Sequence, residues 1–192
     1  MSLLHLTLHQ REFYLEQGYL HLPGLLGSAE AAALRAECHA LAGRLGDHDA
    51  TWASAKAGGT RLTHCHDVQF RAAAFTRLLL DSRLTGLAQD LIGPNVELHH
   101  TKMFIKPPER GSPFPMHQDY HYFPHERHTM LAVIFHFDDA PLEKGCLRVV
   151  PGSHRLGPLP TSTPDHSLPE HPLDAATAVP ARAGDAIVFS YL

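Results

Sequence analysis

The chain has 192 residues and a formal charge of −4, with 16 basic and 20 acidic side chains interspersed along it. Hydrophobic residues make up 44% and charged residues 19%, which is typical of a globular protein with one core. No basic stretch favours nucleic acid as a partner, and no apolar run of about 18 residues predicts a membrane span. Cys38, Cys65 and Cys146 form no Cys-x-x-Cys pair, so we expect reduced thiols in a cytoplasmic protein.

The first 93 residues predict mainly helices that brace a sheet. Thr7 and Gln10 form the Thr-x-x-Gln pattern of a capping box, and Gly18 can close the helix that they begin. Ser28 is a good N-cap for a second helix. The other expected elements are a strand at 19–22, the second helix up to Gly46, a weakly patterned stretch at 47–59, and two helices within 72–92 that break near Asp81-Ser82.

Residues 94–192 predict a β core. Short runs rich in β-branched and aromatic residues are separated by Pro, Gly and Asp turns. The expected strands lie at 96–106, 130–137, 147–150 and 186–192, while 158–180 holds several prolines and predicts a long surface excursion. Many short strands after a helical start favour one domain, residues 1–192, that is mainly β with helical bracing, such as a jelly roll.

His117 and Asp119 are the candidate catalytic and metal-binding residues. On a strand, side chains two residues apart share a face, so this imidazole and carboxylate could bind one metal ion together. With a histidine from a later strand, they would form the facial triad of a non-heme Fe(II) site. His121 shares this face by the same alternation, and Gln118 is adjacent, so both are candidates for contact with substrate.

The motifs around this pair resemble one enzyme family. Lys106-Pro107-Pro108 precedes it, and Pro151-Gly152-Ser153-His154 and Gly184-Asp185 follow in order. From about Gly18 to the end, the chain resembles the phytanoyl-CoA dioxygenase family of Fe(II)- and 2-oxoglutarate-dependent oxygenases. The resemblance implies a double-stranded β-helix of the jelly-roll, cupin-like type, with O2 as co-substrate. It also implies hydroxylation of an aliphatic carbon of a small-molecule or acyl substrate, with release of succinate and CO2.

The resemblance also assigns roles around the pair. Lys106 matches a residue that contacts the oxo acid or substrate, and Lys102 is a second candidate on the same face of a regular strand; an exposed lysine is the alternative. Phe135 resembles an aromatic residue beside the oxo acid, although packing in the core is an equal alternative. Related halogenases carry a small residue at the position of Asp119, so its carboxylate favours hydroxylation. His154 is expected to be structural.

Two family features are expected beyond Leu192. They are a third ligand, a histidine on the strand after Gly184-Asp185, and an arginine that binds the distal carboxylate of 2-oxoglutarate. We therefore expect the C-terminal strands to be missing from this chain. Alternatively, a histidine at 154, 166 or 171 completes the triad, or the chain is a non-catalytic, cupin-like ligand-binding module. A zinc hydrolase, or a zinc-binding helix at 121–128, is disfavoured by the surrounding motifs and by Pro124.

Overall fold

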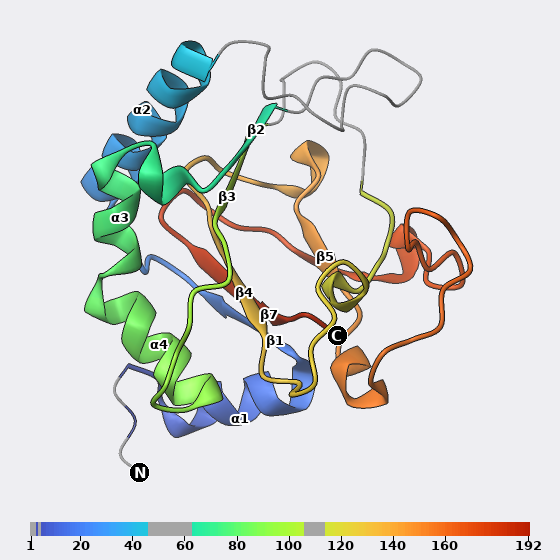
Figure 1. Ribbon diagram of the computed structural model, residues 1–192. Helices are drawn as coiled ribbons and strands as arrows, with labels where there is room; N and C mark the ends of the chain where they lie inside the picture. Colours follow the sequence, from blue (N-terminus) through green and yellow to red (C-terminus); the bar gives the residue numbers. More distant parts are fainter. Residues whose placement is uncertain (1–2, 4, 46–62, 106–113) are drawn as a thin grey trace.

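The computed structural model describes residues 3, 5–45, 63–105 and 114–192, and shows short antiparallel sheets with helices along one side (Figure 1). The first half contains α1 (Leu8–Gln17), β1 (Tyr19–Leu22), α2 (Ser28–Leu45), β2 (Thr63–His66), η3 (Val68–Phe70), α3 (Ala73–Leu79) and α4 (Ser82–Ile92). The second half contains β3 (Lys102–Ile105), η4 (Asp119–His121), β4 (Leu131–Phe135), η5 (Leu142–Lys144), β5 (Leu147–Val149), η6 (Ser153–Leu156), η7 (Leu173–Ala175), β6 (Thr177–Val179) and β7 (Ala186–Ser190).

Strand β7 is the centre of the largest sheet. It pairs antiparallel with β1 on one edge and with β4 on the other, so that Val188 faces Leu20 and Val133. Ala186, Ile187 and Val188 have no exposed surface. Because strand side chains alternate, Ala186 and Val188 enter one apolar cluster and Ile187 enters another on the opposite face. Both faces and both edges of β7 are therefore covered.

Helices α1 and α4 cover one face of this sheet (Figure 1). Tyr14 of α1 and two leucines of α4 pack with β1 and β7 in a cluster that consists of Leu6, Tyr14, Leu20, Leu22, Leu87, Leu91, Ala186 and Val188. A second cluster joins α2, η3 and α3 to the antiparallel pair β2–β3, which is a separate two-stranded sheet. Strands β5 and β6 form the third sheet, and Val179 of β6 packs against Ile187 on the other face of β7.

The turn before β7 is held by polar contacts. Oδ1 of Asp185 accepts from the amide of Gly24 and Oδ2 from the amide of Arg182, each at 2.8 Å, and His21 Nε2 lies 2.8 Å from Oδ2. Burial alone would raise the pKa of Asp185, but these hydrogen bonds lower it below its ordinary value. Gly184 has φ 98°, and a Cβ there would lie 2.6 Å from the carbonyl oxygen of Leu26. Only glycine fits this close approach.

Most of the expected elements in the first half are confirmed. The Thr7–Gln10 capping box is present, and Gly18 ends α1 in the left-handed conformation. Helices α3 and α4 break where expected, and the Asp81 side chain caps α4. Ser28 is the first residue of α2, not its N-cap, and Gly46 and residues 47–59 lie outside the described residues. No helix among the described residues is long and apolar enough to cross a membrane.

The β core was predicted with less accuracy. In the described part of the strand expected at 96–106, only Lys102–Ile105 is strand, and the strands expected at 130–137 and 186–192 are also shorter. Strands β2 and β6 were not predicted. Since β1 pairs with β7 and β2 pairs with β3, the first half supplies strands as well as bracing helices.

Candidate active site

His117 lies two residues before η4 begins at Asp119, and the two side chains lie side by side. His117 Nε2 is 3.2 Å from Asp119 Oδ1, and Nδ1 of the same ring is 2.7 Å from the carbonyl oxygen of Pro115. Nδ1 therefore donates its hydrogen to Pro115, which leaves Nε2 facing the carboxylate. Two electron-pair donors at this separation need a proton or a cation between them. The pair fits a metal ion, in the orientation that a backbone carbonyl commonly gives to a metal-binding histidine.

The proton affinity of His117 agrees with this arrangement. Burial alone would lower the pKa of His117, but the Asp119 carboxylate and the Pro115 carbonyl raise it above its ordinary value. Each of the two paired side chains is 26% exposed, so an ion from solvent can reach them. A metal ion at Nε2 would compete with the proton held there, and its binding is expected to release that proton.

The backbone at this pair is not the strand that was predicted. Gln118 is extended, but Asp119–His121 forms the 3-10 helix η4, and the amide of Phe123 donates to the carbonyl of Asp119 at 3.2 Å. Strand alternation was therefore the wrong reason for the convergence of His117 and Asp119. They meet because the chain turns at Asp119. The same turn removes the alternation argument that placed His121 on their face.

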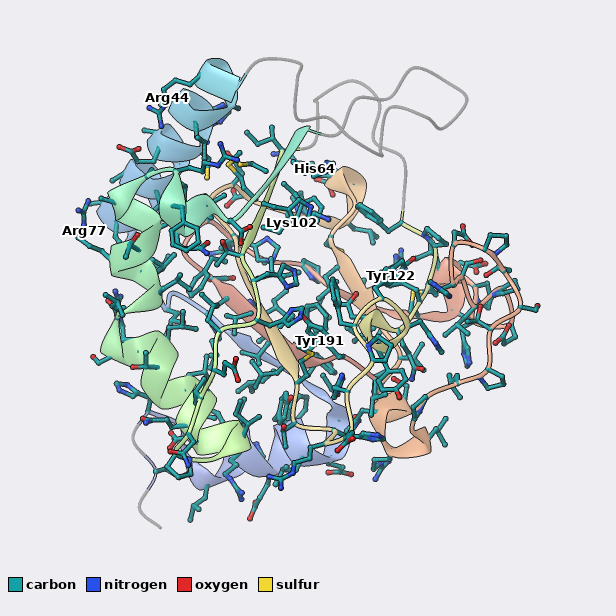
Figure 2. The ribbon with its side chains drawn as sticks, viewed as in Figure 1. Arg44, His64, Arg77, Lys102, Tyr122 and Tyr191 are labelled. Carbon is teal, nitrogen blue, oxygen red and sulfur yellow. The ribbon has the colours of Figure 1, made fainter. Side chains whose placement is uncertain are left out.

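Lys102, the first residue of β3, lies within electrostatic reach of Asp119. Burial lowers the pKa of the Lys102 ammonium, and the negative charge of Asp119 opposes this change. Its Nζ atom lies 4.7 Å from the centre of the Phe104 ring. Figure 2 shows Lys102 in the middle of the molecule, in the region where Tyr122 and Tyr191 also lie. A partly buried ammonium can bind an anionic ligand here. Lys106 lies outside the described residues.

Histidine and tyrosine rings form the surroundings of Asp119. Burial lowers the pKa of His100, as do His99, His66 and Lys102, while Asp119 opposes them. Burial, with the charge of Asp119, raises the pKa of Tyr191 to about 12. Sequence reasoning missed His100 and Tyr191 as site residues. The His99-His100 doublet just before Lys102 was the available signal for the first, whereas nothing local marked the second.

Phe123, two residues after the end of η4, also contacts these rings. Its ring centre lies 4.9 Å from those of both His99 and His100, and 5.9 Å from that of Tyr191. The Tyr122 ring contacts His117 edge to face, with centres 5.7 Å apart. The candidate site is therefore bordered by flat rings that combine apolar faces with polar edges.

Gln118 fixes the following loop, residues 157–171, against the pair. Its Nε2 donates to the carbonyl of Gly157 at 3.1 Å, and its Oε1 accepts from the amide of Leu159 at 2.8 Å. The Leu168 amide donates to the carbonyl of Met116 at 2.8 Å. The Gln118 side chain is buried and both ends of its amide are used within the protein. The structure thus gives Gln118 a supporting role, and its contact with substrate stays a prediction.

The other predicted site residues have identifiable neighbours. Phe135 on β4 packs against both apolar clusters of the helical side, which fits the core alternative; a position beside the oxo acid stays a prediction. His121 stacks on His166, with ring centres 5.6 Å apart and planes at 18°. His154 Nε2 donates to the carbonyl of Leu15 at 3.0 Å, which fits the expected structural role.

No group of three His, Cys, Asp or Glu side chains in the described part of the chain can hold a metal ion. His154, His166 and His171 therefore do not complete a triad with His117 and Asp119 here. The alternative of a zinc-binding helix at 121–128, which Pro124 disfavoured, is not formed: η4 ends at His121, and Nδ1 of His125 donates to the carbonyl of Phe123.

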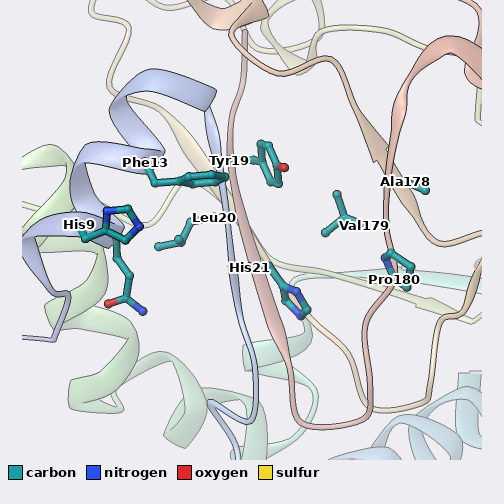
Figure 3. Close-up of a pocket in the computed structure, with 9 residues that line it drawn as sticks. His9, Phe13, Tyr19, Leu20, His21, Ala178, Val179 and Pro180 are labelled. Atoms are coloured by element: carbon teal, nitrogen blue, oxygen red, sulfur yellow. The ribbon is translucent and has the colours of Figure 1, made fainter.

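A hollow of about 390 Å³ lies apart from this pair, between α1, β1 and β6 (Figure 3). Its lining is His9, Gln10, Phe13, Tyr19, Leu20, His21, Ala178, Val179 and Pro180. Phe13 and Tyr19 meet edge to face at one end, and His21 is bonded to Asp185 at the other. None of the candidate site residues lines it.

Comparison with known proteins identifies the family. The sequence model described as phytanoyl-CoA dioxygenase (PhyH) matches residues 14–192. The chain belongs to this family. The sequence resemblance is thereby confirmed over nearly the whole chain.

Several curated members of the phytanoyl-CoA dioxygenase family or similar enzymes resemble the chain. The peroxisomal phytanoyl-CoA dioxygenase of Homo sapiens is 31% identical over 163 residues, which are 78% of this chain and 48% of the human protein. Ectoine dioxygenase of Halomonas elongata is 30% identical over 156 residues, 79% of this chain and 47% of the relative. The chain spans about half the length of the curated relatives it matches.

Solved structures have the same fold. The non-heme alpha ketoglutarate dependent carbocyclase SnoK from nogalamycin biosynthesis has a TM-score of 0.82 and 28% identity, over 96% of this chain and 74% of SnoK. The epimerase SnoN, solved with Fe3+, alpha ketoglutarate and nogalamycin RO, has a TM-score of 0.75 and 26% identity, over 95% of this chain and 73% of SnoN. EctD from S. alaskensis with bound Fe, at 22% identity and a TM-score of 0.77, supports the fold alone.

Proposed function

We propose that this chain carries the metal-binding motif of a non-heme Fe(II)- and 2-oxoglutarate-dependent dioxygenase. The observation that carries the proposal is the His117–Asp119 pair, in which Nε2 and Oδ1 converge to 3.2 Å while Pro115 fixes the imidazole tautomer. Family membership supports it, and so do similar proteins whose names and titles include iron and alpha ketoglutarate.

Each residue of the candidate site has its own role in this proposal. His117 Nε2 and the Asp119 carboxylate would hold the iron, while the Pro115 carbonyl keeps the imidazole turned toward it. Bound iron and 2-oxoglutarate supply the oxidation: one atom of O2 enters succinate as CO2 leaves, and the other enters a substrate C–H bond. Lys102, together with Lys106, would bind a carboxylate of the oxo acid, with Phe135 against its carbon chain. The described residues supply two metal ligands, and the third ligand would come from outside the described residues.

We also propose that the sheets belong to one double-stranded β-helix, or jelly roll, as one oxygenase domain over residues 1–192. The two-sided burial of β7 and the similarity to SnoK support this arrangement. In it, the helices brace one face and the candidate site opens on the side where β3, η4 and the 157–171 loop lie.

The proposed reaction is hydroxylation of an aliphatic carbon of a small molecule. Asp119 supports this choice, because its carboxylate occupies the position that must be free for a halide in related halogenases. Relatives are named for substrates as different as ectoine, L-proline and phytanoyl-CoA, so the fold alone does not select among polar and acyl molecules. The polar rings around Asp119 favour a small polar substrate over a long acyl chain.

Succinate formation tests the proposal. The full-length protein would be incubated with Fe(II), 2-oxoglutarate and O2, with and without a chelator, and alongside an Asp119→Ala variant. Chelator-sensitive succinate formation that Asp119→Ala lacks is the expected result. Iron-independent turnover, or equal turnover by the variant, would contradict the assignment of this pair.

A cupin-like module that binds a ligand without turnover is the alternative. It is favoured by one observation, that the described side chains supply no group of three metal ligands. Binding of 2-oxoglutarate without any succinate, measured by calorimetry on the same preparation, would favour the module. A zinc hydrolase would show neither 2-oxoglutarate binding nor succinate.

A further inference from the structure

The side chain of His121 contains a buried nitrogen that no described residue satisfies. Its Nε2 atom has no hydrogen-bond partner among the described residues and no contact with solvent. The His166 ring stacks beside His121 in an offset arrangement, with ring centres 5.6 Å apart and planes at 18°. Buried polar atoms without a partner are uncommon in native structures and call for an explanation.

His166 has an unusual backbone as well. Its φ is 54°, and Asp67 is the other non-glycine residue with positive φ in the described part of the chain. The left-handed conformation is held by a local turn, in which the His166 amide donates to the carbonyl of Thr163 at 3.0 Å. Such conformations are disfavoured for most residues and often mark functional positions. Two unfavourable features, one polar and one conformational, thus coincide in a single pair of rings.

The pair lies next to the proposed metal ligands. The edge of the Tyr122 ring meets both His166, at 5.0 Å between centres, and His117, at 5.7 Å. The Tyr122 hydroxyl donates to the carbonyl of Asp165, so the phenol is already used by the loop. His121 Nε2 is therefore a buried nitrogen of this group of rings that a ligand could engage once it is uncovered.

We propose that His166 is a movable, specificity-determining cover over His121. When the His166 ring rotates away, His121 Nε2 forms a hydrogen bond with a hydroxyl or carboxylate of a compact polar substrate. This inference rests on the proposed function, because it places the substrate beside His117 and Asp119. It adds a chemical class of substrate and a residue of the 157–171 loop that controls its entry.

Hydrogen bonds hold the backbones of both His121 and His166. His121 ends η4, where the amide of Tyr120 donates to the carbonyl of Tyr191 at 2.9 Å and the amide of Phe123 donates to Asp119. His166 lies in a loop between exposed Asp165 and partly buried Ser167, whose carbonyl accepts from the hydroxyls of Thr161 and Thr163. Uncovering His121 therefore calls for rotation of the His166 side chain and not for movement of either backbone.

Diethylpyrocarbonate, which modifies accessible imidazole nitrogens, provides the test. The rate of modification of each histidine would be mapped by mass spectrometry in the wild type and in His166→Asn. Asparagine tolerates the left-handed backbone, so this change removes the ring without a new strain. His171→Asn is the matched control in the same loop. We expect modification of His121 to rise at least fivefold in His166→Asn and to stay unchanged in His171→Asn.

Protection by ligands tests the chemical class. Glycolate, which offers a hydroxyl and a carboxylate, is expected to slow modification of His121 at least twofold in His166→Asn with 2-oxoglutarate present, and palmitoyl-CoA is not. Fast modification of His121 in the wild type, no increase in His166→Asn, or protection by palmitoyl-CoA instead of glycolate would overturn the proposal. None of these outcomes depends on succinate formation, so failure of the oxygenase assignment would be seen separately.

Discussion

Strand β7 and the segment 115–123 differ in how far the protein itself satisfies their side chains. In β7, Ala186, Ile187 and Val188 are completely buried, both edges are paired, and alternate side chains enter two apolar clusters. In the segment, a 3-10 turn replaces the strand, and His117 and Asp119 remain 26% exposed. One region satisfies every contact inside the protein, whereas the other leaves polar atoms available.

This difference indicates where stability and where chemistry are located. Burial of the apolar side chains of β7 stabilises the folded state, and this strand has no buried side-chain nitrogen or oxygen without a partner. The segment instead keeps a histidine and a carboxylate close together at partial exposure, with a nitrogen of His121 that no described residue satisfies. A site that binds ions or substrate must keep such groups unused by the fold. Substitutions in the two regions should therefore affect different properties.

The largest expected effect is on function, from His117→Ala. Loss of this ligand should lower Fe(II)-dependent succinate formation at least about hundredfold, because even outer partners of metal ligands contribute about 10–100-fold. The urea midpoint should change little, since the ring is not part of an apolar cluster. His128→Ala, an exposed histidine nearby, is the control for both assays. Unchanged turnover in His117→Ala would show that the segment 115–123 is not where the chemistry takes place.

Ile187→Ala should have the opposite profile. It removes a fully buried side chain between β7 and β6, and such truncations cost about 2–5 kcal/mol of unfolding free energy. Urea denaturation measures this loss, with Leu8→Ala, at a position that is 71% exposed, as the control. The folded fraction should retain Fe(II) binding. A cost similar to that of Leu8→Ala would show that β7 is not the centre of stability.

The fold could be predicted where local signals were strong. The capping box at Thr7, the end of α1 at Gly18 and the break near Asp81-Ser82 depend on neighbours within a few residues, and all three are present. Strands β2 and β6 have only four and three residues and are stabilised by pairing with β3 and β5. Partners distant in sequence decide such short strands, so no local pattern could reveal them.

The site could be predicted in part for the same reason. His117 and Asp119 are close in sequence, so their convergence was predictable even though the reason given, a strand, was wrong. Lys102 was also a candidate, and it does lie within reach of Asp119. Tyr191 and His166 reach the site only through tertiary packing and the 157–171 loop. The supporting role of Gln118 likewise depends on a loop forty residues away.

Gln118→Leu tests how the loop is held to the site. The change removes both hydrogen bonds of the amide and leaves the Leu159 amide and the Gly157 carbonyl without this partner. We expect a loss of about 1–3 kcal/mol in unfolding free energy, the usual cost of unsatisfied buried groups. Hydrogen exchange should accelerate at 157–171 before it does at β7. Gln89→Leu, which removes one exposed bond to Pro94, is the control.

The smallest effect is expected at the start of α4, which belongs to neither region. The Arg83 guanidinium, 2.7 Å from Asp81, lowers the pKa of that carboxyl from 3.8 to about 2. Because the folded-state pKa is the lower one, the ionised form stabilises the protein above pH 3.8, and this contribution is lost as the pH falls toward 2. Asp81→Asn keeps a helix-capping side chain but removes the charge. Its urea midpoint should therefore fall less steeply with acid than that of the wild type. Parallel acid profiles for the two proteins would show that this ion pair is screened by solvent and contributes nothing measurable.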